Sequence, residues 1–451
     1  MPPAPSPVLT TARDVLDPAH LRAALRVNPA DATLAAALRV GAAAALVLAL
    51  SAAVGRTDLA ASASLGALVI LYGRYEPYRR RASLLAGVAG LFVASFLVTA
   101  SLTAAGAPTL LVLAVVALVA GASTVLCVLV RTGPPGASIV VFAAAGGMAG
   151  PLAWSDVAER GTAFALGAAV AWLVGMSGWL VRPSAPARLA VRRAADAVRR
   201  TRDVASGDPA AAQAASAAVA RAREVLADDL SRRRTRDAAR VLAAELASVA
   251  AALEPEPGPE ARPGDGPAPP VRSVPPADAL PPRRRLRDDV RASWRAPGWR
   301  LSGVRVLLAS VVAGAGTLAA GLSHPAWAQL GATATLQGAT THHAVVRALQ
   351  RGGGTVLGAL VAWPLLAADL PFAVTCVVVV ALQVVTELVV GRHYGLAMLT
   401  ITPMALLMTS LGSTVDPAGV AASRALDTVL GAVVGVLAVV LVHPRRRPAE
   451  A

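Results

Sequence analysis

Three ionisable side chains in apolar surroundings are the strongest candidates for chemistry in this sequence. Arg160 and Arg424 each open an apolar stretch, and Asp427 follows Arg424 by about one helical turn. A charge in such a place is costly and usually faces a cavity or a partner. The positions of the two arginines have two interpretations. The arginines form a vestibule that attracts an organic anion, or they form structural ion pairs that anchor the helix ends. Asp427 is a candidate proton-coupling carboxylate, although pairing with Arg424 alone would also explain it.

Two of the less hydrophobic stretches, 59–73 and 326–341, carry hydroxyl and amide groups. They occupy matching places in the internal repeat described below, and paired weak stretches of this kind point to a transport site. Hydroxyl and amide groups could bind a carboxylate or a phenol without a buried full charge. Hydrogen bonding between helices is the alternative. The candidate pathway residues are Ser62, Ser64, Thr333, Thr335 and Gln337.

The sequence contains no recognisable catalytic or metal-binding motif. Cys127 and Cys376 both lie in apolar runs, and a solvated pair explains 342–343 (His-His) better than a metal site does. The glycines of 352–354 lack the preceding strand and the following Gly-Lys pair of a phosphate-binding loop. We therefore expect neither an enzyme nor a protein with a metal or another cofactor.

The composition indicates which elements hold these residues. Of the 451 residues 55% are hydrophobic and 15% charged, whereas soluble domains carry about 25% charge. A membrane-spanning helix needs about 20 mostly apolar residues. Twelve candidate spans follow, at 34–54, 59–73, 84–105, 108–130, 137–153, 160–181, 302–322, 326–341, 352–368, 371–390, 394–411 and 421–442. The predicted fold is an all-α integral membrane protein.

Arginine placement predicts the orientation of these helices. The formal charge is +15, and arginines gather in the connections 74–83, 347–351 and 445–447, whereas alternate connections hold Asp58 and Asp369. An excess of arginine in short loops marks the cytoplasmic side. Both termini and the long middle segment are therefore predicted to be cytoplasmic. The basic groups line the membrane and form no nucleic-acid recognition motif, so we expect no nucleic-acid partner.

The two clusters of six spans resemble each other. Residues 65–67 (Leu-Gly-Ala) correspond to residues 330–332, and Arg160 corresponds to Arg424. The two pairs are separated by nearly the same number of residues along the sequence. Six helices in each half make a parallel repeat. The predicted organisation is a cytosolic N-terminal segment (1–33), a first six-helix membrane repeat (34–182), a cytosolic helical insert (183–300) with a Pro-rich linker (254–282), a second six-helix membrane repeat (301–443) and a basic cytosolic tail (444–451).

Two segments, 347–358 and 424–431, resemble motifs of the fusaric acid resistance and aromatic acid exporter family. The residues that match are Arg347, Arg351, Gly354, Thr355, Gly358 and Gly431. The first half departs from the pattern, because 80–87 lacks the Gly-Thr pair and 160–167 lacks the acidic residue. The resemblance implies an inner-membrane exporter of aromatic or other organic acids, with an integral membrane transporter domain.

Three functions are compatible with these features. The first is an exporter of organic (aromatic) acids or other anions across the plasma membrane, with a pathway between the two repeats. The second is a passive anion channel, and the third is a non-transporting scaffold that acts through its cytosolic helices. The expected partners are a small organic anion and the lipid bilayer, and the sequence is also compatible with a homo-oligomer.

Overall fold

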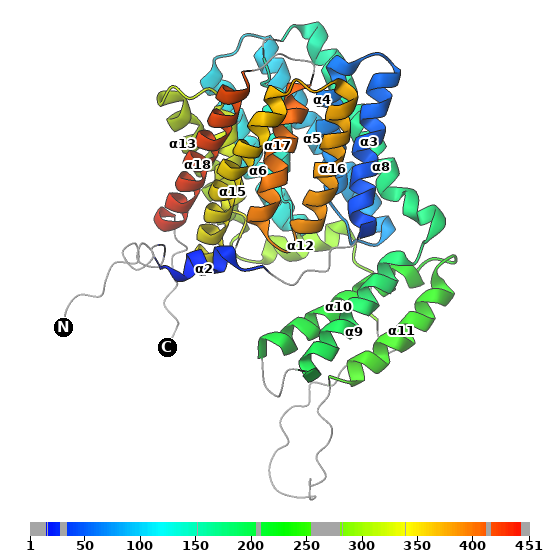
Figure 1. The fold of residues 1–451 in the computed structure, drawn as a ribbon. Helices are drawn as coiled ribbons and strands as arrows, with labels where there is room; N and C mark the ends of the chain where they lie inside the picture. Colours follow the sequence, from blue (N-terminus) through cyan, green and yellow to red (C-terminus); the bar gives the residue numbers. More distant parts are fainter. Residues whose placement is uncertain are drawn as a thin grey trace, which may run out of the picture. The chain divides into compact units, whose positions relative to one another are not determined.

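The computed structural model is helical throughout the residues it describes (Figure 1). Those residues are 15, 17–27, 34–150, 152–203, 209–253, 280–281, 283–338, 340–411 and 416–442. In these ranges there are seventeen α-helices and two short 3-10 helices, and no strand. The prediction of an all-α protein is confirmed. Most of the Pro-rich linker at 254–282 and the tail at 444–451 lie outside the described residues.

The helices divide into three runs along the chain. Before the insert lie α2 (Ala19–Leu25), α3 (Leu34–Ala53), η1 (Thr57–Leu59), α4 (Ala60–Ala67), η2 (Leu68–Leu71), α5 (Tyr78–Ala104), α6 (Thr109–Val130), α7 (Ala137–Gly146) and α8 (Trp154–Val181). The insert contains α9 (Ala185–Asp203), α10 (Pro209–Leu230), α11 (Arg236–Ala251) and α12 (Leu286–Arg295). After it come α13 (Trp299–Ala319), α14 (Pro325–Thr335), α15 (Thr341–Ala367), α16 (Phe372–Val389), α17 (Tyr394–Ser410) and α18 (Pro417–Leu441).

Seven of the described helices are long and apolar enough to cross a membrane, namely α3, α5, α6, α8, α13, α16 and α18. Each of the twelve predicted spans overlaps a helix. The stretch 57–71, α7 and α17 are shorter apolar helices, and α14 has only 11 residues. A helix of that length rises about 16 Å, about half the thickness of the hydrocarbon core.

The chain separates into two compact units. The first comprises 1–74, 84–175 and 289–451, and the second comprises 75–83 and 176–288. Most of the apolar helices and all the candidate site residues belong to the first unit. The second unit contains α9, α10 and α11 (Figure 1).

The start of α15 differs from the predicted span. The span was placed at 352–368, whereas α15 begins at Thr341. The reason is a cap, because the side chain of Thr340 accepts a hydrogen bond from the backbone N–H of His343. Arg347 and Arg351 therefore lie inside a helix and not in a loop. Their arginine charges had suggested a connection, since most helices avoid charge in apolar surroundings.

Small residues let the helices of the first unit cross closely. A Cβ on Gly431 of α18 would overlap the carbonyl oxygen of Ala328 on α14, and one on Gly354 of α15 would lie 2.7 Å from the Cβ of Met398 on α17. Helix α15 thus packs closely on α17 and α18, and α18 packs closely on α14. This packing brings their polar residues together.

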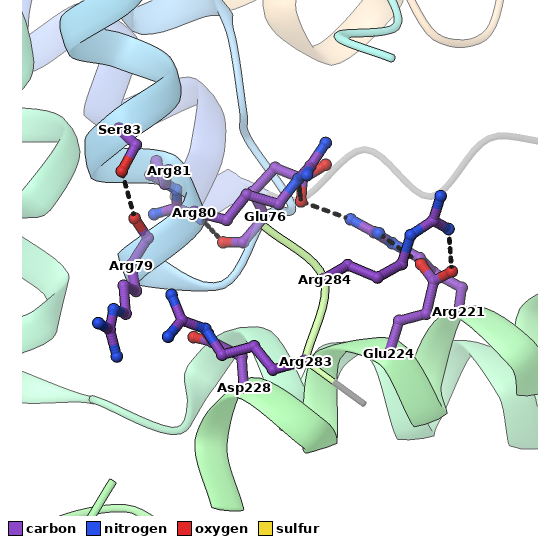
Figure 2. Close-up of polar contacts among 10 residues, drawn as sticks. All are labelled: Glu76, Arg79, Arg80, Arg81, Ser83, Arg221, Glu224, Asp228, Arg283 and Arg284. Carbon is purple, nitrogen blue, oxygen red and sulfur yellow. Dashed lines mark hydrogen bonds and ion pairs between the residues drawn. The ribbon is translucent and has the colours of Figure 1, made fainter. Parts of the chain in front are cut away.

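The second unit is held by a small apolar core and a network of ion pairs (Figure 2). The Glu76 carboxylate pairs with Arg221 of α10 at 2.8 Å, and Arg221 also pairs with Glu224 at 3.0 Å. Arg284 reaches the other oxygen of Glu224 at 2.7 Å. Burial acts to raise the pKa of Glu224, but hydrogen bonds from Arg284 and Arg221 hold it below its ordinary value. The network ties the segment before α5 to the insert.

Candidate functional site

Arg424 lies in the interior of the first unit with unsatisfied donors. It occupies the third turn of α18 and is 2% exposed. Its guanidinium carbon lies 5.0 Å from the ring centroid of Trp327 on α14, a cation–π contact. Neither Nε nor Nη1 has a hydrogen-bond partner. A buried guanidinium without a full set of acceptors is costly, so this geometry favours a ligand that supplies them.

A second buried guanidinium faces the same region from α15. Arg351 is 4% exposed, and its Nη1 donates to the hydroxyl of Tyr394 at 2.7 Å, while Nε and Nη2 have no partner. Arg347 lies one turn earlier, 4.3 Å from the centroid of the Tyr394 ring. The charges of Arg351 and Arg424 repel one another. Two like charges in apolar surroundings require a compensating negative charge.

The carboxyl group that interacts with Arg424 is Asp427. It is fully buried, and its Oδ2 accepts a hydrogen bond from Ser423 at 2.9 Å, while Oδ1 has no partner. Arg424 and Asp427 share one face of α18 because they are three residues apart. One carboxylate cannot balance both Arg424 and Arg351, so an excess positive charge remains for an anion.

Buried hydroxyl groups adjoin the two guanidinium groups. Thr355 follows Arg351 by one turn of α15, and Thr428 follows Arg424 by one turn of α18. Both side chains are fully buried and both hydroxyls lack a partner. We call the group formed by Arg351, Arg424, Asp427 and these two threonines, together with the rings of Trp327 and Tyr394, the arginine site. It presents donors, one carboxylate and two aromatic faces.

The remaining predicted pathway residues lie in several places. Thr335 is buried with an unpartnered hydroxyl, but Thr333 bonds to the carbonyl of Gln329 in its own helix. Gln337 lies beyond the end of α14, where its amide donates to Ser138 of α7 at 3.0 Å and its oxygen accepts from Arg347 at 3.3 Å. Contacts between and within helices satisfy the side chains of Thr333 and Gln337, whereas the hydroxyl of Thr335 is left without a partner.

Arg160 and the serines of α4 are not brought to the arginine site by any contact among the described residues. Arg160 is half-buried and donates to the carbonyl of Ala149 at 3.1 Å. Ser62 and Ser64 are buried on α4, and the hydroxyl of Ser64 has no partner. The vestibule predicted from Arg160 and Arg424 thus places its two members in different environments. The family-motif residues Gly354, Gly358 and Gly431 serve as crossing points for helices.

Four residues in or beside this site were not predicted from the sequence: His324, Trp327, Tyr394 and Ser423. Trp327 lies in the first turn of α14, where it is 9% exposed and stacks on His324 at 4.1 Å between ring centroids. Tyr394 and Ser423 carry no motif that separates them from other polar residues. A usable signal was the spacing of Ser423, Arg424 and Asp427, which places all three on one side of α18.

Comparisons with known proteins place the site within a recognised segment. Residues 308–438 match the family model described as fusaric acid resistance protein-like. The uncharacterized membrane protein YvaC of Bacillus subtilis (strain 168) is 31% identical over 129 residues, which are 28% of this chain and 20% of YvaC. No solved structure matches the chain. The predicted resemblance is confirmed for a segment that contains every residue of the arginine site.

Proposed function

We propose that this membrane protein transports small organic anions, which bind at the arginine site. The observation that carries the proposal is the pair of buried guanidinium groups, Arg351 and Arg424, each of which has two nitrogens without a hydrogen-bond partner. A carboxylate is the ligand that satisfies such groups best, because it accepts two parallel hydrogen bonds and supplies the missing charge. The fusaric acid resistance protein-like segment supports a transporter in preference to a scaffold.

The aromatic groups of the site support an aromatic anion as the substrate. Trp327 and Tyr394 each place a ring beside an arginine. A flat ligand with a carboxylate at one end would meet donors at that end and apolar ring faces along its body. Thr355 and Thr428 add hydroxyls that bind either a carboxylate or a phenol.

We also propose that the twelve apolar segments cross the plasma membrane as two parallel repeats with both termini in the cytoplasm. The proposal of two repeats is supported by two helix crossings that occupy corresponding places in the two halves of the chain. A Cβ on Gly167 of α8 would overlap the carbonyl oxygen of Ala63 on α4, as one on Gly431 of α18 would overlap that of Ala328 on α14. The short helices then cross the bilayer in the company of their neighbours.

Uptake of radiolabelled benzoate into proteoliposomes tests the proposal. Replacing both arginines (R351Q/R424Q) removes several charge-assisted hydrogen bonds of about 1.5 to 3 kcal/mol each, so we expect uptake to fall by about a hundredfold or more. The control variant is R392Q, which changes an exposed arginine in the connection before α17. Unchanged uptake by a folded R351Q/R424Q protein would contradict the proposal.

The same vesicles distinguish a carrier from a channel. A carrier must return its site, so benzoate preloaded inside the vesicles should accelerate entry of labelled benzoate. A passive channel shows no such acceleration, and a scaffold shows no uptake at all. We expect acceleration, because a buried site between packed helices is reached from one side at a time.

A further inference from the structure

A hydrogen-bonded chain leads from the residue before α14 to the buried carboxyl group of the arginine site. The Nδ1 atom of His324 lies 2.8 Å from the hydroxyl oxygen of Ser423. That hydroxyl lies 2.9 Å from Oδ2 of Asp427. Ser423 and Asp427 are one turn apart on α18, and the imidazole that contacts Ser423 comes from His324, directly before α14. The three groups form a continuous line.

The hydrogen bonds of this chain all point toward Asp427. Ser423 has a single hydroxyl proton, and it donates that proton to the carboxylate. While Asp427 is ionised, the oxygen of Ser423 can then only accept from His324, which corresponds to the form of His324 with a proton on Nδ1. Each donor thus has its proton directed at the next acceptor. This order is the one required to pass a proton from the imidazole to the carboxylate.

The two ends of the chain differ in exposure. His324 and Ser423 are half-buried, while Asp427 is fully buried and its Oδ1 has no partner. The imidazole is held in place because it stacks on Trp327 with an angle of 10° between the rings. His324 and Ser423 thus connect the buried carboxyl group to a more exposed side chain.

We propose that His324 and Ser423 relay protons to Asp427, so that a proton accompanies the organic anion at the arginine site. A hydronium ion from solvent first protonates Nε2 of His324 and leaves water, so that the ring becomes an imidazolium. The Nδ1–H bond of His324 then breaks as a new O–H bond forms on Ser423, and the former Ser423 proton binds Oδ2 of Asp427. The imidazole is left neutral with its proton on Nε2. The role of the anion rests on the proposed function, whereas the relay itself does not.

The charges around Asp427 link its proton to the anion. Arg424 and His324 face the carboxyl group, and Arg351 faces Arg424 from α15. An ionised Asp427 offsets the charge of Arg424, and a neutral Asp427 leaves both guanidinium groups uncompensated. The neutral form therefore binds an anion more tightly. A proton and an anion should bind together.

Infrared spectroscopy tests the relay without any transport measurement. In the full-length protein in lipid, the neutral carboxyl band that is absent from D427N identifies Asp427. On transfer to deuterated water we expect this band to exchange at least about tenfold more slowly in S423A and in H324F than in the unaltered protein. H324F keeps a ring against Trp327 but cannot carry a proton.

Two further variants control this measurement. S423T retains the hydroxyl and should restore the exchange rate, while S51A removes an intrahelical hydrogen bond on α3 and should leave the rate unchanged. Exchange in S423A or H324F at the rate of the unaltered protein would overturn the relay, because solvent would then reach Asp427 directly. Slow exchange in both, with recovery in S423T, supports it.

Benzoate binding tests the link to the anion. Between about pH 6 and about pH 8, affinity should rise toward acid by up to about tenfold per pH unit in the unaltered protein and stay constant in D427N. A pH-independent affinity in the unaltered protein overturns the coupling. If benzoate does not bind at all while the exchange pattern holds, the relay is supported and the proposed function fails.

Discussion

The crossing of α4 with α8 and the crossing of α14 with α18 make the same backbone contact in different chemical settings. A Cβ on Gly66 would overlap the carbonyl oxygen of Phe164, and a Cβ on Gly331 would lie 3.0 Å from the carbonyl oxygen of Thr428. Phe164 and Thr428 therefore hold matching positions. In the first crossing this position is an aromatic ring, and in the second it is a hydroxyl beside Arg424.

The first crossing is filled by apolar side chains. Phe164 stacks on Phe96 at 4.7 Å between centroids and lies 6.5 Å from Phe92, and all three rings are buried. Ala163 stands there in the place that Asp427 holds in the second crossing. Large rings exclude water and contribute packing energy. This crossing is a core.

The second crossing instead contains charged and hydroxyl groups without partners. Arg424 is buried on the ring of Trp327, whereas its matching residue Arg160 is half-buried and bonded to a backbone carbonyl. In both places, small residues allow the two helices to cross closely, and this sets the backbone geometry. The side chains at matching positions then decide between a core and a binding site.

Importing the aromatic residue of the first crossing into the second should have the largest effect. T428F places a ring where the hydroxyl adjoins Arg424, so we expect benzoate affinity to fall by about a hundredfold or more, measured by equilibrium binding. T428V keeps the shape and loses only the hydroxyl, so about a fivefold loss is expected. Normal binding by T428F would show that the anion lies elsewhere.

The reverse exchange should affect stability and not binding. F164T removes a buried ring and leaves a cavity, which we expect to cost about 3 kcal/mol in the free energy of unfolding, measured in detergent by circular dichroism. Benzoate affinity should be unchanged. The matched control is L166T on the same helix, since Leu166 is 61% exposed. An equal loss in both variants would contradict the assignment of a core to the first crossing.

Adding a methyl group at either crossing should have similar effects in both. G167A and G431A each place a Cβ against a carbonyl oxygen of the facing helix, so each should lower stability by about 1 to 3 kcal/mol. G87A on α5 meets open space and is the control. If only one of the two crossings responded, the shared backbone geometry would not govern both.

A buried carboxyl group outside the membrane helices, that of Asp229, makes stability depend on pH. Burial and the charge of Asp228 raise the pKa of Asp229 to about 7 from an ordinary value of 3.8. The folded state therefore holds a proton that the unfolded state has released, and stability falls as pH rises through this window. Hydrogen exchange of residues 209–253, corrected for intrinsic rates, should show this loss. D229N should abolish the pH dependence.

Parts of the fold and of the site could be predicted because they depend on neighbouring residues. Runs of apolar residues located a helix for every predicted span, and the spacing of Arg424 and Asp427 placed them on one face of a helix. The predicted start of the helix that contains Arg351 was too late in the sequence, because the cap at Thr340, and not hydropathy, determines where this helix begins. The contact of Trp327 with Arg424 was not predicted, since a single ring carries no signal of what it packs against.

By itself the sequence determined that the chain is helical, rich in apolar segments and marked by a few arginines within them. These properties follow from composition and from the period of the helix, which are local. Only the tertiary structure decided that the charges of Arg351 and Arg424 interact and that His324 is hydrogen-bonded to Ser423. These groups lie far apart along the chain, and their meeting depends on which helices can approach closely at glycine. That choice is made by the fit of whole surfaces, which no short stretch of sequence contains.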